Sequence, residues 1–371
     1  MYLIVHGLFL LQMKPFKTYE EQLSLLKSRH LLPSDASECS FAQVLDFRGK
    51  DNHKILFIPT QSNLRKLALT KMDKQVIELL QTYGYYNIVN QYNKPFLNTD
   101  GSYQSDIDFF KLYSLQQIDY AMENALFYSL LQIERHLKIS ISYEFAKHYG
   151  PFEGDDMTNY DEPYLQKTNY NQSLRTKKGE LKCDCLIKHL NKIYLNHTYK
   201  PFIHYKKVHH HIPIWVLSNK FTFGELIHFY EVLKIQNKIS VQFHLTPSQL
   251  RTSMAFLHCV RNDCAHFTGF YNQSYPHLKG DIPLVIDFMN NYGFNTVDSI
   301  PNLFLVLILF KYFLSPNDYR SVLRHVTSNV FAQIFERPIC KISEYIQDVL
   351  VLKDKNDCKD KLNFLLHYEI H

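Results

Sequence analysis

The sequence is poor in glycine and proline, and it lacks a run of apolar residues long enough to cross a membrane. With 11 Gly and 14 Pro in 371 residues, it favours a folded, mostly helical protein. The most apolar stretch, Leu303 to Leu314, contains Lys311 and is shorter than the ~20 residues of a transmembrane helix. Met1 to Leu11 has neither a basic start nor a cleavage site, which argues against a signal peptide. We therefore predict a buried helix at Leu303 to Leu314 and no membrane partner.

Cysteine pairs and strong charge are also missing. Seven cysteines form no small-domain disulfide framework, which favours the reducing cytoplasm. Cys183-Asp184-Cys185 has no second matching pair, and neither it nor His209-His210-His211 resembles a structural metal site. We predict no metal and no cofactor. The formal net charge of +5 permits a polyanionic partner without requiring one.

Apolar residues recur at helical spacing through most of the chain, so the predicted fold class is all-α. The longest periodic stretch runs from Asp106 to Tyr149 and stops at Gly150-Pro151. Its apolar face is marked by Leu115, Ile118, Met122, Leu126, Ile133, Leu137 and Ile141. Residues 151–179 are polar and aperiodic, as in a loop, and His53 to Ile58 allows one short strand. The charged tail from Lys353 is predicted to be dispensable.

The stretch from Arg261 to His266 (RNDCAH) is predicted near the end of a helix that starts at Thr246-Pro247-Ser248-Gln249. This start combines a cap, a proline at the first helical position and a glutamine that can reach back to the cap. A buried stripe follows at Leu250, Met254, Leu257 and Cys264. Arg261 lies in line with that stripe, which costs free energy unless the guanidinium is paired or faces a groove.

Two interpretations of Arg261 and His266 remain open. Arg261 can extend to solvent at the helix edge, with His266 interacting with the helix dipole. Alternatively, the two residues form half of a ribonuclease site. Five residues on an ideal helix are ~140° apart. They can meet on one phosphate only if the helix ends or distorts before His266, or if a second copy of the chain completes the site.

Other polar residues allow similar alternatives. Glu134, beside the apolar row of the long helix, is either a solvated charge or a carboxylate that holds an active-site arginine from the facing helix. Between Lys177 and Lys207, lysines are interspersed with Tyr194, Tyr199 and Tyr205. They form either a solvated helical face or a surface that follows RNA. The residues predicted to bind RNA are Lys177, Lys178, Lys182, Lys206 and Lys207.

Four stretches, taken in order, carry a resemblance to a known family. They are Lys14-Pro15-Phe16 with Thr18-Tyr19-Glu20-Glu21-Gln22, Gly84-Tyr85-Tyr86-Asn87 with Pro95-Phe96-Leu97, Pro213-Ile214-Trp215-Val216-Leu217 with Phe223-Gly224, and Arg261 to His266 with Tyr271-Asn272. Together, over residues 13 to 275, they resemble the Abi-like (AbiD/AbiF) abortive-infection family of bacterial phage-defence proteins. The family start resembles Met13-Lys14-Pro15-Phe16, so residues 1–12 are expected to be an upstream extension. Gln91 replaces an expected glycine, and residues 34 to 72 are longer than usual.

The family is similar to HEPN domains, helical bundles in which Arg-x4–6-His marks metal-independent endoribonucleases. The resemblance implies a HEPN-like core at residues 101–290, with the loop at 151–179 inside it. It also implies an N-terminal helical region at 13–100 and C-terminal helices at 291–371. HEPN proteins usually form homodimers in which two motifs meet in one cleft.

The chemistry implied by the resemblance is attack of a ribose 2′-hydroxyl on its own 3′-phosphate. His266 would act as general base or general acid, and Arg261 would bind the phosphate. Asn262 and Glu134 would position them. A small structured RNA is an expected partner besides the substrate RNA. The alternative function is a non-catalytic RNA-binding or phage-sensing scaffold.

Overall fold

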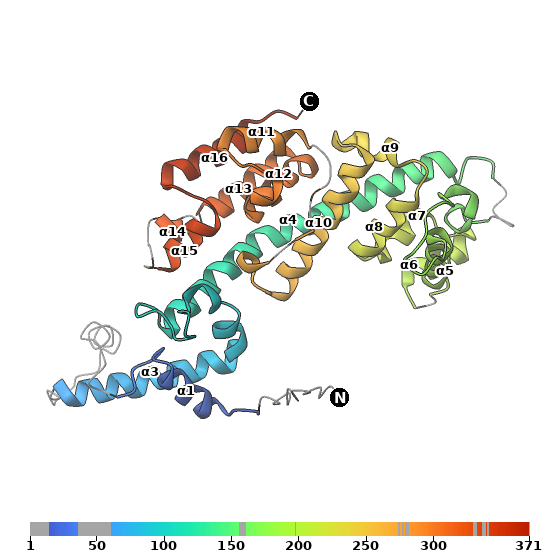
Figure 1. Ribbon diagram of the computed structural model, residues 1–371. Coiled ribbons are helices and arrows are strands. Elements are labelled where there is room, and N and C mark those ends of the chain that lie inside the picture. Colours follow the sequence, from blue (N-terminus) through green and yellow to red (C-terminus); the bar gives the residue numbers. More distant parts are fainter. Residues whose placement is uncertain are drawn as a thin grey trace, which may run out of the picture. The chain divides into compact units, whose positions relative to one another are not determined.

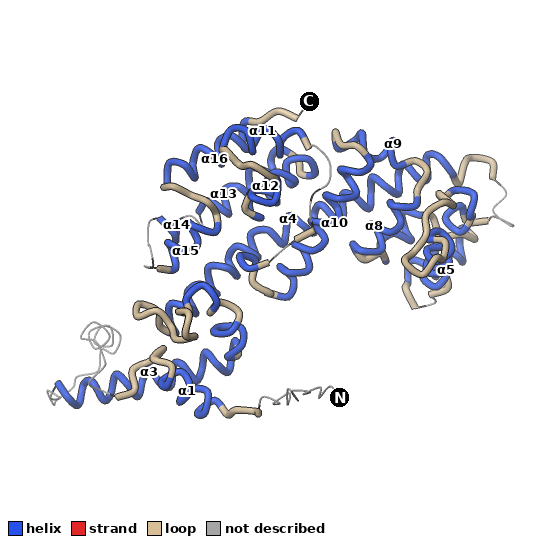
Figure 2. Tube along the Cα trace, viewed as in Figure 1, coloured by secondary structure: helices blue, strands red, loops and turns tan. Residues whose placement is uncertain are grey.

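The computed structural model describes residues 15–35, 61–155, 161–196, 198–273, 275–276, 278, 282–328, 332–335, 339 and 341–370. In these residues helices are joined by turns and loops, with isolated β-bridges and no strand (Figure 2). The all-α prediction is therefore confirmed. The short strand allowed at His53 to Ile58 and the expected extension at 1–12 lie outside the described residues.

Contacts within the chain divide it into two compact units, Met1–Gln116 and Gln117–His371. The finer division into regions 13–100, 101–290 and 291–371 stays a prediction. The first unit contains the following helices: α1 (Tyr19–Ser28), α3 (Gln61–Tyr83), the π-helix η1 (Tyr86–Asn90) and the 3-10 helix η2 (Lys94–Phe96). Helix α1 begins with a capping box between Thr18 and Glu21. It packs on α3, where Lys27 forms an ion pair with Asp73 at 2.7 Å.

The second unit is built along most of the long helix α4 (Phe109–Tyr149), which ends where Gly150 and Pro151 were predicted to stop it (Figure 1). All seven apolar residues predicted to mark one face of this helix are buried. The α-helices that follow are α5 (Lys182–Tyr194), α6 (Lys200–His209), α7 (Ile214–Leu217), α8 (Phe223–Val232), α9 (Gln236–Ser240), α10 (Pro247–His266), α11 (Pro283–Tyr292), α12 (Asn302–Phe313), α13 (Pro316–Val326), α14 (Ala332–Phe335), α15 (Ile342–Val349) and α16 (Lys355–His367). The described part of the predicted loop at 151–179 contains two short 3-10 helices and buries Tyr164 and Tyr170.

The C-terminal helices form an apolar core around α12. Ten of its twelve residues are buried, so the run at Leu303 to Leu314 is a core helix as predicted. None of the described helices is both long and apolar enough to cross a membrane. Helix α12 also contacts α4, because the His136 ring lies with Nδ1 2.9 Å from the carbonyl oxygen of Phe313.

The prediction that the tail from Lys353 is dispensable is wrong. Residues Lys355–His367 form α16, which packs on α12 and α13 and buries Leu362 and Leu365. The ammonium group of Lys311 donates to the backbone oxygens of Leu365 and Leu366 at 3.0 and 2.9 Å. The tail contains many charged residues, so its narrow apolar face is not obvious from composition. The helix becomes stable because this face packs on α12 and α13.

A buried carboxyl group ties α4 to the turn that follows α10. Glu123 accepts a hydrogen bond from the backbone N–H of Gly269 at 3.2 Å, and its other oxygen is buried without a partner. Burial, with a smaller contribution from the nearby Asp119 charge, raises the pKa of Glu123 to about 9. The side chain is therefore a neutral acid at pH 7.

This protonation predicts that the protein loses stability as the pH rises from near 4.5 toward 9. In that range the folded state holds a proton that the unfolded state has released, so each pH unit costs at most about 1.4 kcal/mol. Glu123→Gln keeps the acceptor for Gly269 and removes the titration. In thermal unfolding, the variant should match the wild type near pH 5 and exceed its Tm increasingly toward pH 9. A constant difference in Tm across this range would contradict the assignment.

Candidate active site

Helix α10 begins as predicted and buries the predicted stripe of apolar residues. Thr246 and Gln249 form a capping box, Pro247 is the first helical residue, and Leu250, Met254, Leu257 and Cys264 are buried. The helix continues through His266 and ends at Phe267, which adopts a left-handed conformation (φ 52°). Since it neither ends nor distorts before His266, Arg261 and His266 project from different sides of α10. One chain alone therefore does not bring this pair together on one phosphate.

Arg261 projects from α10 toward α4, where it forms an ion pair with Glu134. Its Nε atom lies 3.3 Å from Oε2 of Glu134, although the N–H is not aligned as a hydrogen bond. The Arg261 side chain is only 20% exposed. Its Cζ atom also lies 6.0 Å from the ring centroid of Phe223, the first residue of α8. The arginine is thus paired and half-buried, rather than extended freely into solvent.

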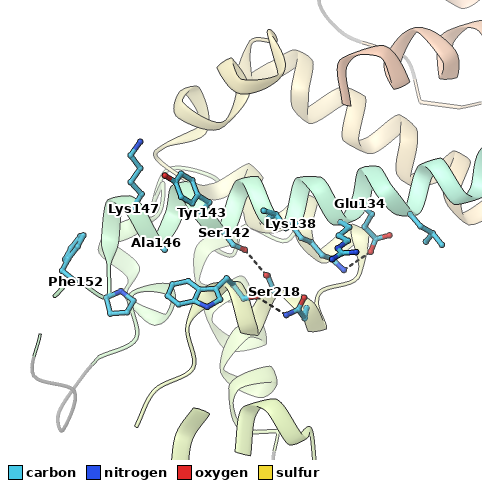
Figure 3. A pocket seen from close by; sticks show the side chains of 14 residues that line it. Glu134, Lys138, Ser142, Tyr143, Ala146, Lys147, Phe152 and Ser218 are labelled. Atoms are coloured by element: carbon cyan, nitrogen blue, oxygen red, sulfur yellow. Dashed lines mark hydrogen bonds and ion pairs between the residues drawn. The ribbon is translucent and has the colours of Figure 1, made fainter. Parts of the chain in front are cut away.

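Glu134 also holds a second cation, because its Oε1 atom lies 3.0 Å from Nζ of Lys138 one turn later on α4. Figure 3 shows this pair near one end of a groove along α4. One carboxylate between two cations leaves a local excess of positive charge. Such an excess suits the binding of a phosphate.

His258 is a neighbour of this pair that the sequence analysis missed. Its Nε2 atom lies 3.2 Å from the Asn262 side-chain nitrogen, and its ring meets that of Phe223 edge-on. Burial, and next the charge of Arg261, lower the pKa of His258 below its usual value. The amide N–H of Asn262 can donate to Nε2 only when this nitrogen is unprotonated, which agrees with a neutral ring.

Helical spacing could have revealed His258. It precedes Arg261 by three residues and Asn262 by four, so the three side chains lie on neighbouring positions of one helix face. Gly224 of α8 lies beside this face of α10. A Cβ atom at Gly224 would meet the His258 ring at 3.4 Å. Gly224 itself lies within the first turn of α8.

An arginine followed five residues later by a histidine does not by itself identify a functional site. Helix α13 carries Arg320 and His325 at the same interval of five residues. Both are exposed, and both bond within their own helix, Arg320 to the Asn317 side chain and His325 to the Ser321 carbonyl oxygen. What distinguishes Arg261 is the carboxylate that a second helix places beside it.

His266 is exposed at the last position of α10. The structure therefore places Arg261, Asn262 and Glu134 together with His258, and leaves His266 on a different side of the same helix. The turn after His266 is fixed by the hydrogen bond from the Thr268 hydroxyl to the Asp263 carboxylate at 2.8 Å.

The five predicted RNA-binding lysines differ in their surroundings. Lys177, Lys178 and Lys207 are exposed. Lys182 forms an ion pair with Glu231 at 2.7 Å, and Lys206 donates to the Tyr194 carbonyl oxygen and lies over the Tyr194 ring. These two ammonium groups are engaged within the chain, so the three exposed lysines are the better candidates for contacts with RNA.

Across the part of the chain that the structure describes, no group of three or more His, Cys, Asp and Glu side chains is arranged to hold a metal ion. Cys183 is buried and Cys185 is exposed.

A family model described as Abi-like protein matches residues 78–272, just over half of the chain. The chain belongs to the Abi-like protein family. The matched region contains every candidate residue of this Abi-like chain, from Glu134 to His266, whereas the stretch from Lys14 to Gln22 lies outside it. No curated protein and no solved structure matches the chain.

Proposed function

We propose that this Abi-like protein is a HEPN-type endoribonuclease of the AbiD/AbiF kind that cleaves RNA during abortive infection. The observation that carries the proposal is the ion pair between Arg261 and Glu134 from facing helices. A half-buried guanidinium beside a carboxylate is held in one place and keeps N–H groups for a phosphate. The family membership supports a role in phage defence.

The proposed reaction is transesterification within the RNA. The 2′-oxygen loses its proton and attacks the adjacent phosphorus, and the bond from phosphorus to the 5′-oxygen breaks. His266 takes the proton from the 2′-hydroxyl or gives one to the leaving 5′-oxygen. Arg261 stabilises the negative charge that develops on the phosphate oxygens. The products are a 2′,3′-cyclic phosphate and a 5′-hydroxyl.

The other polar residues act through Arg261 and α10. Glu134 fixes the guanidinium from α4, and Asn262, which lies 3.2 Å from His258, stabilises the same face of α10. Because Arg261 and His266 lie on different sides of the helix, a second copy of the chain supplies the missing partner of each. The working enzyme is thus a homodimer in the cytoplasm, and it needs no metal.

Incubation of the purified protein with labelled RNA in the presence of EDTA tests this function. We expect cleavage to persist, and the fragments to carry 2′,3′-cyclic phosphate and 5′-hydroxyl ends. An oligonucleotide with one 2′-deoxyribose at the cleaved position should survive, because it lacks the attacking oxygen. Loss of cleavage in EDTA, or 3′-hydroxyl products, would exclude this mechanism.

Glu134 offers a second prediction. Glu134→Gln removes the negative charge but keeps the size of the side chain, so Arg261 loses its ion pair without a large cavity. We expect RNA cleavage to fall about 10- to 100-fold, as when an orienting partner of a functional residue is lost. The folded state should persist by circular dichroism. Glu344→Gln on α15, an exposed glutamate paired with Lys341, is the matched control and should leave the rate unchanged.

The alternative is a non-catalytic RNA-binding or phage-sensing scaffold. The observation that favours it is the separation of His266 from Arg261 around α10, which leaves a single chain without a complete pair. Such a protein would bind RNA, including a small structured RNA at Lys177, Lys178 and Lys207, and would release it uncut.

A further inference from the structure

A groove of about 860 Å³ runs along the exposed face of α4 from Leu131, past Glu134, to Lys147. Its other walls come from Pro151 and Phe152 after α4, from Trp215 in α7, and from Ser218 and Asn219. Figure 3 shows Glu134, Lys138, Tyr143 and Lys147 in a row along α4, with Phe152 at the end far from Glu134. A hydrogen bond from the Ser142 hydroxyl to the Ser218 hydroxyl, 2.9 Å long, links α4 to the opposite wall of the groove.

The groove exposes aromatic rings that a folded chain normally buries. Tyr143 is 61% exposed, Phe152 is 55% exposed, and Trp215 is 47% exposed. Leu131 and Ile139 on α4 add two exposed aliphatic side chains. An exposed apolar surface of this kind marks a binding site, and flat rings are platforms on which bases stack.

The charge along the groove is positive. Arg135, Lys138 and Lys147 line it, and Glu134 is the single acidic residue among the lining side chains. That carboxylate is already shared between Lys138 and Arg261. Lys138 is paired with Glu134, and Lys147 lies 4.0 Å from Glu144, so two carboxylates face the three lining cations and Arg261. A hydrophobic peptide would leave this excess of positive charge without a counter-charge. In single-stranded nucleic acid, the bases can stack on the aromatic rings while the phosphates pair with the cations.

We propose that this groove binds the single-stranded RNA next to the phosphate that is cut, with bases stacked on Trp215 and Tyr143. The phosphates lie against the exposed Arg135 and Lys147, and the strand leads to Arg261 at the Glu134 end. Glu134 and Lys147 are about 20 Å apart along the helix, enough for about six stacked nucleotides. This inference rests on the proposed nuclease function for the position of the strand, but RNA binding can be tested without cleavage.

Trp215 is the single tryptophan of the chain, so intrinsic fluorescence reports on the groove directly. The probe is a short single-stranded RNA with 2′-O-methyl riboses, which cannot be cut by 2′-hydroxyl attack. We expect it to quench the tryptophan emission of the wild type. Trp215→Ala and Tyr143→Ala should each weaken binding about 5- to 150-fold in fluorescence anisotropy. Trp215→Phe, which keeps a stacking ring, should stay close to the wild type.

Tyr128→Ala is the matched control, since Tyr128 is 68% exposed on the same helix but lies outside the groove. It should change the affinity less than about twofold. Unchanged tryptophan emission, undiminished binding by both alanine variants, or equal affinity for duplex RNA would overturn the proposal. So would a loss of self-association, rather than of RNA binding, in Trp215→Ala. Binding in the groove without any cleavage of ordinary RNA would support this inference and contradict the nuclease function alone.

Discussion

Replacing either Arg261 or His266 by alanine is expected to lower the rate of RNA cleavage by about 10²- to 10⁴-fold. Arg261→Ala removes the fork of N–H groups that stabilises the phosphate in the transition state. His266→Ala removes the group that transfers a proton. Arg261→Lys should recover little activity, because an ammonium group keeps the charge but cannot form two parallel hydrogen bonds. The measurement is the single-turnover rate on a labelled RNA.

The chain supplies its own control for these substitutions. Arg320→Ala and His325→Ala alter an arginine and a histidine with the same spacing on α13, where both bond within their own helix. They should leave the rate within about twofold of the wild type, as is usual for surface substitutions. If the α13 substitutions lowered the cleavage rate as much as the α10 substitutions, or if His266→Ala kept its activity, Arg261 and His266 would not be the catalytic pair.

Mixing two inactive chains is expected to restore activity if the site is shared between protomers. A heterodimer of Arg261→Ala and His266→Ala contains one composite site with an intact arginine from one chain and an intact histidine from the other. It should cleave RNA at about half the rate of the wild-type dimer, whereas each variant homodimer stays inactive. The physical reason is that α10 turns these two side chains ~140° apart. Differently tagged chains, co-expressed and purified through both tags, provide the heterodimer.

The reciprocal heterodimer separates shared from unshared sites. Pairing a chain that carries both substitutions with a wild-type chain leaves every shared site without one residue, so it should be inactive. If Arg261 and His266 of one chain acted together, this heterodimer would keep half of the activity and the first would keep none. Activity in the first heterodimer alone therefore shows that Arg261 and His266 act across two chains, and activity in the second alone shows that they act within one chain.

Local sequence signals determined most of the helices. The capping box at Thr246, the helix stop at Gly150-Pro151 and the buried helix at Leu303 to Leu314 were predicted from the sequence and are present in the structure. Each of these signals acts within a few residues, through a side chain that satisfies a helix end or through a stripe that must be buried. Helix α16 was missed because its stability depends on packing against α12 and α13, which composition does not reveal.

The sequence by itself determined that the chain is helical and that Arg261 needs a partner, because an unpaired guanidinium in line with a buried stripe is unfavourable. Only the tertiary structure decided which partner it has. Glu134 lies 127 positions earlier, and packing of α4 on α10 brings it within 3.3 Å of Arg261 while the equally spaced Arg320 is left at the surface. His258 belongs to the same cluster through its position on α10, where its Nε2 atom lies 3.2 Å from the Asn262 side-chain nitrogen. Spacing along one helix fixes which residues share a face, but contacts between helices depend on how distant segments pack.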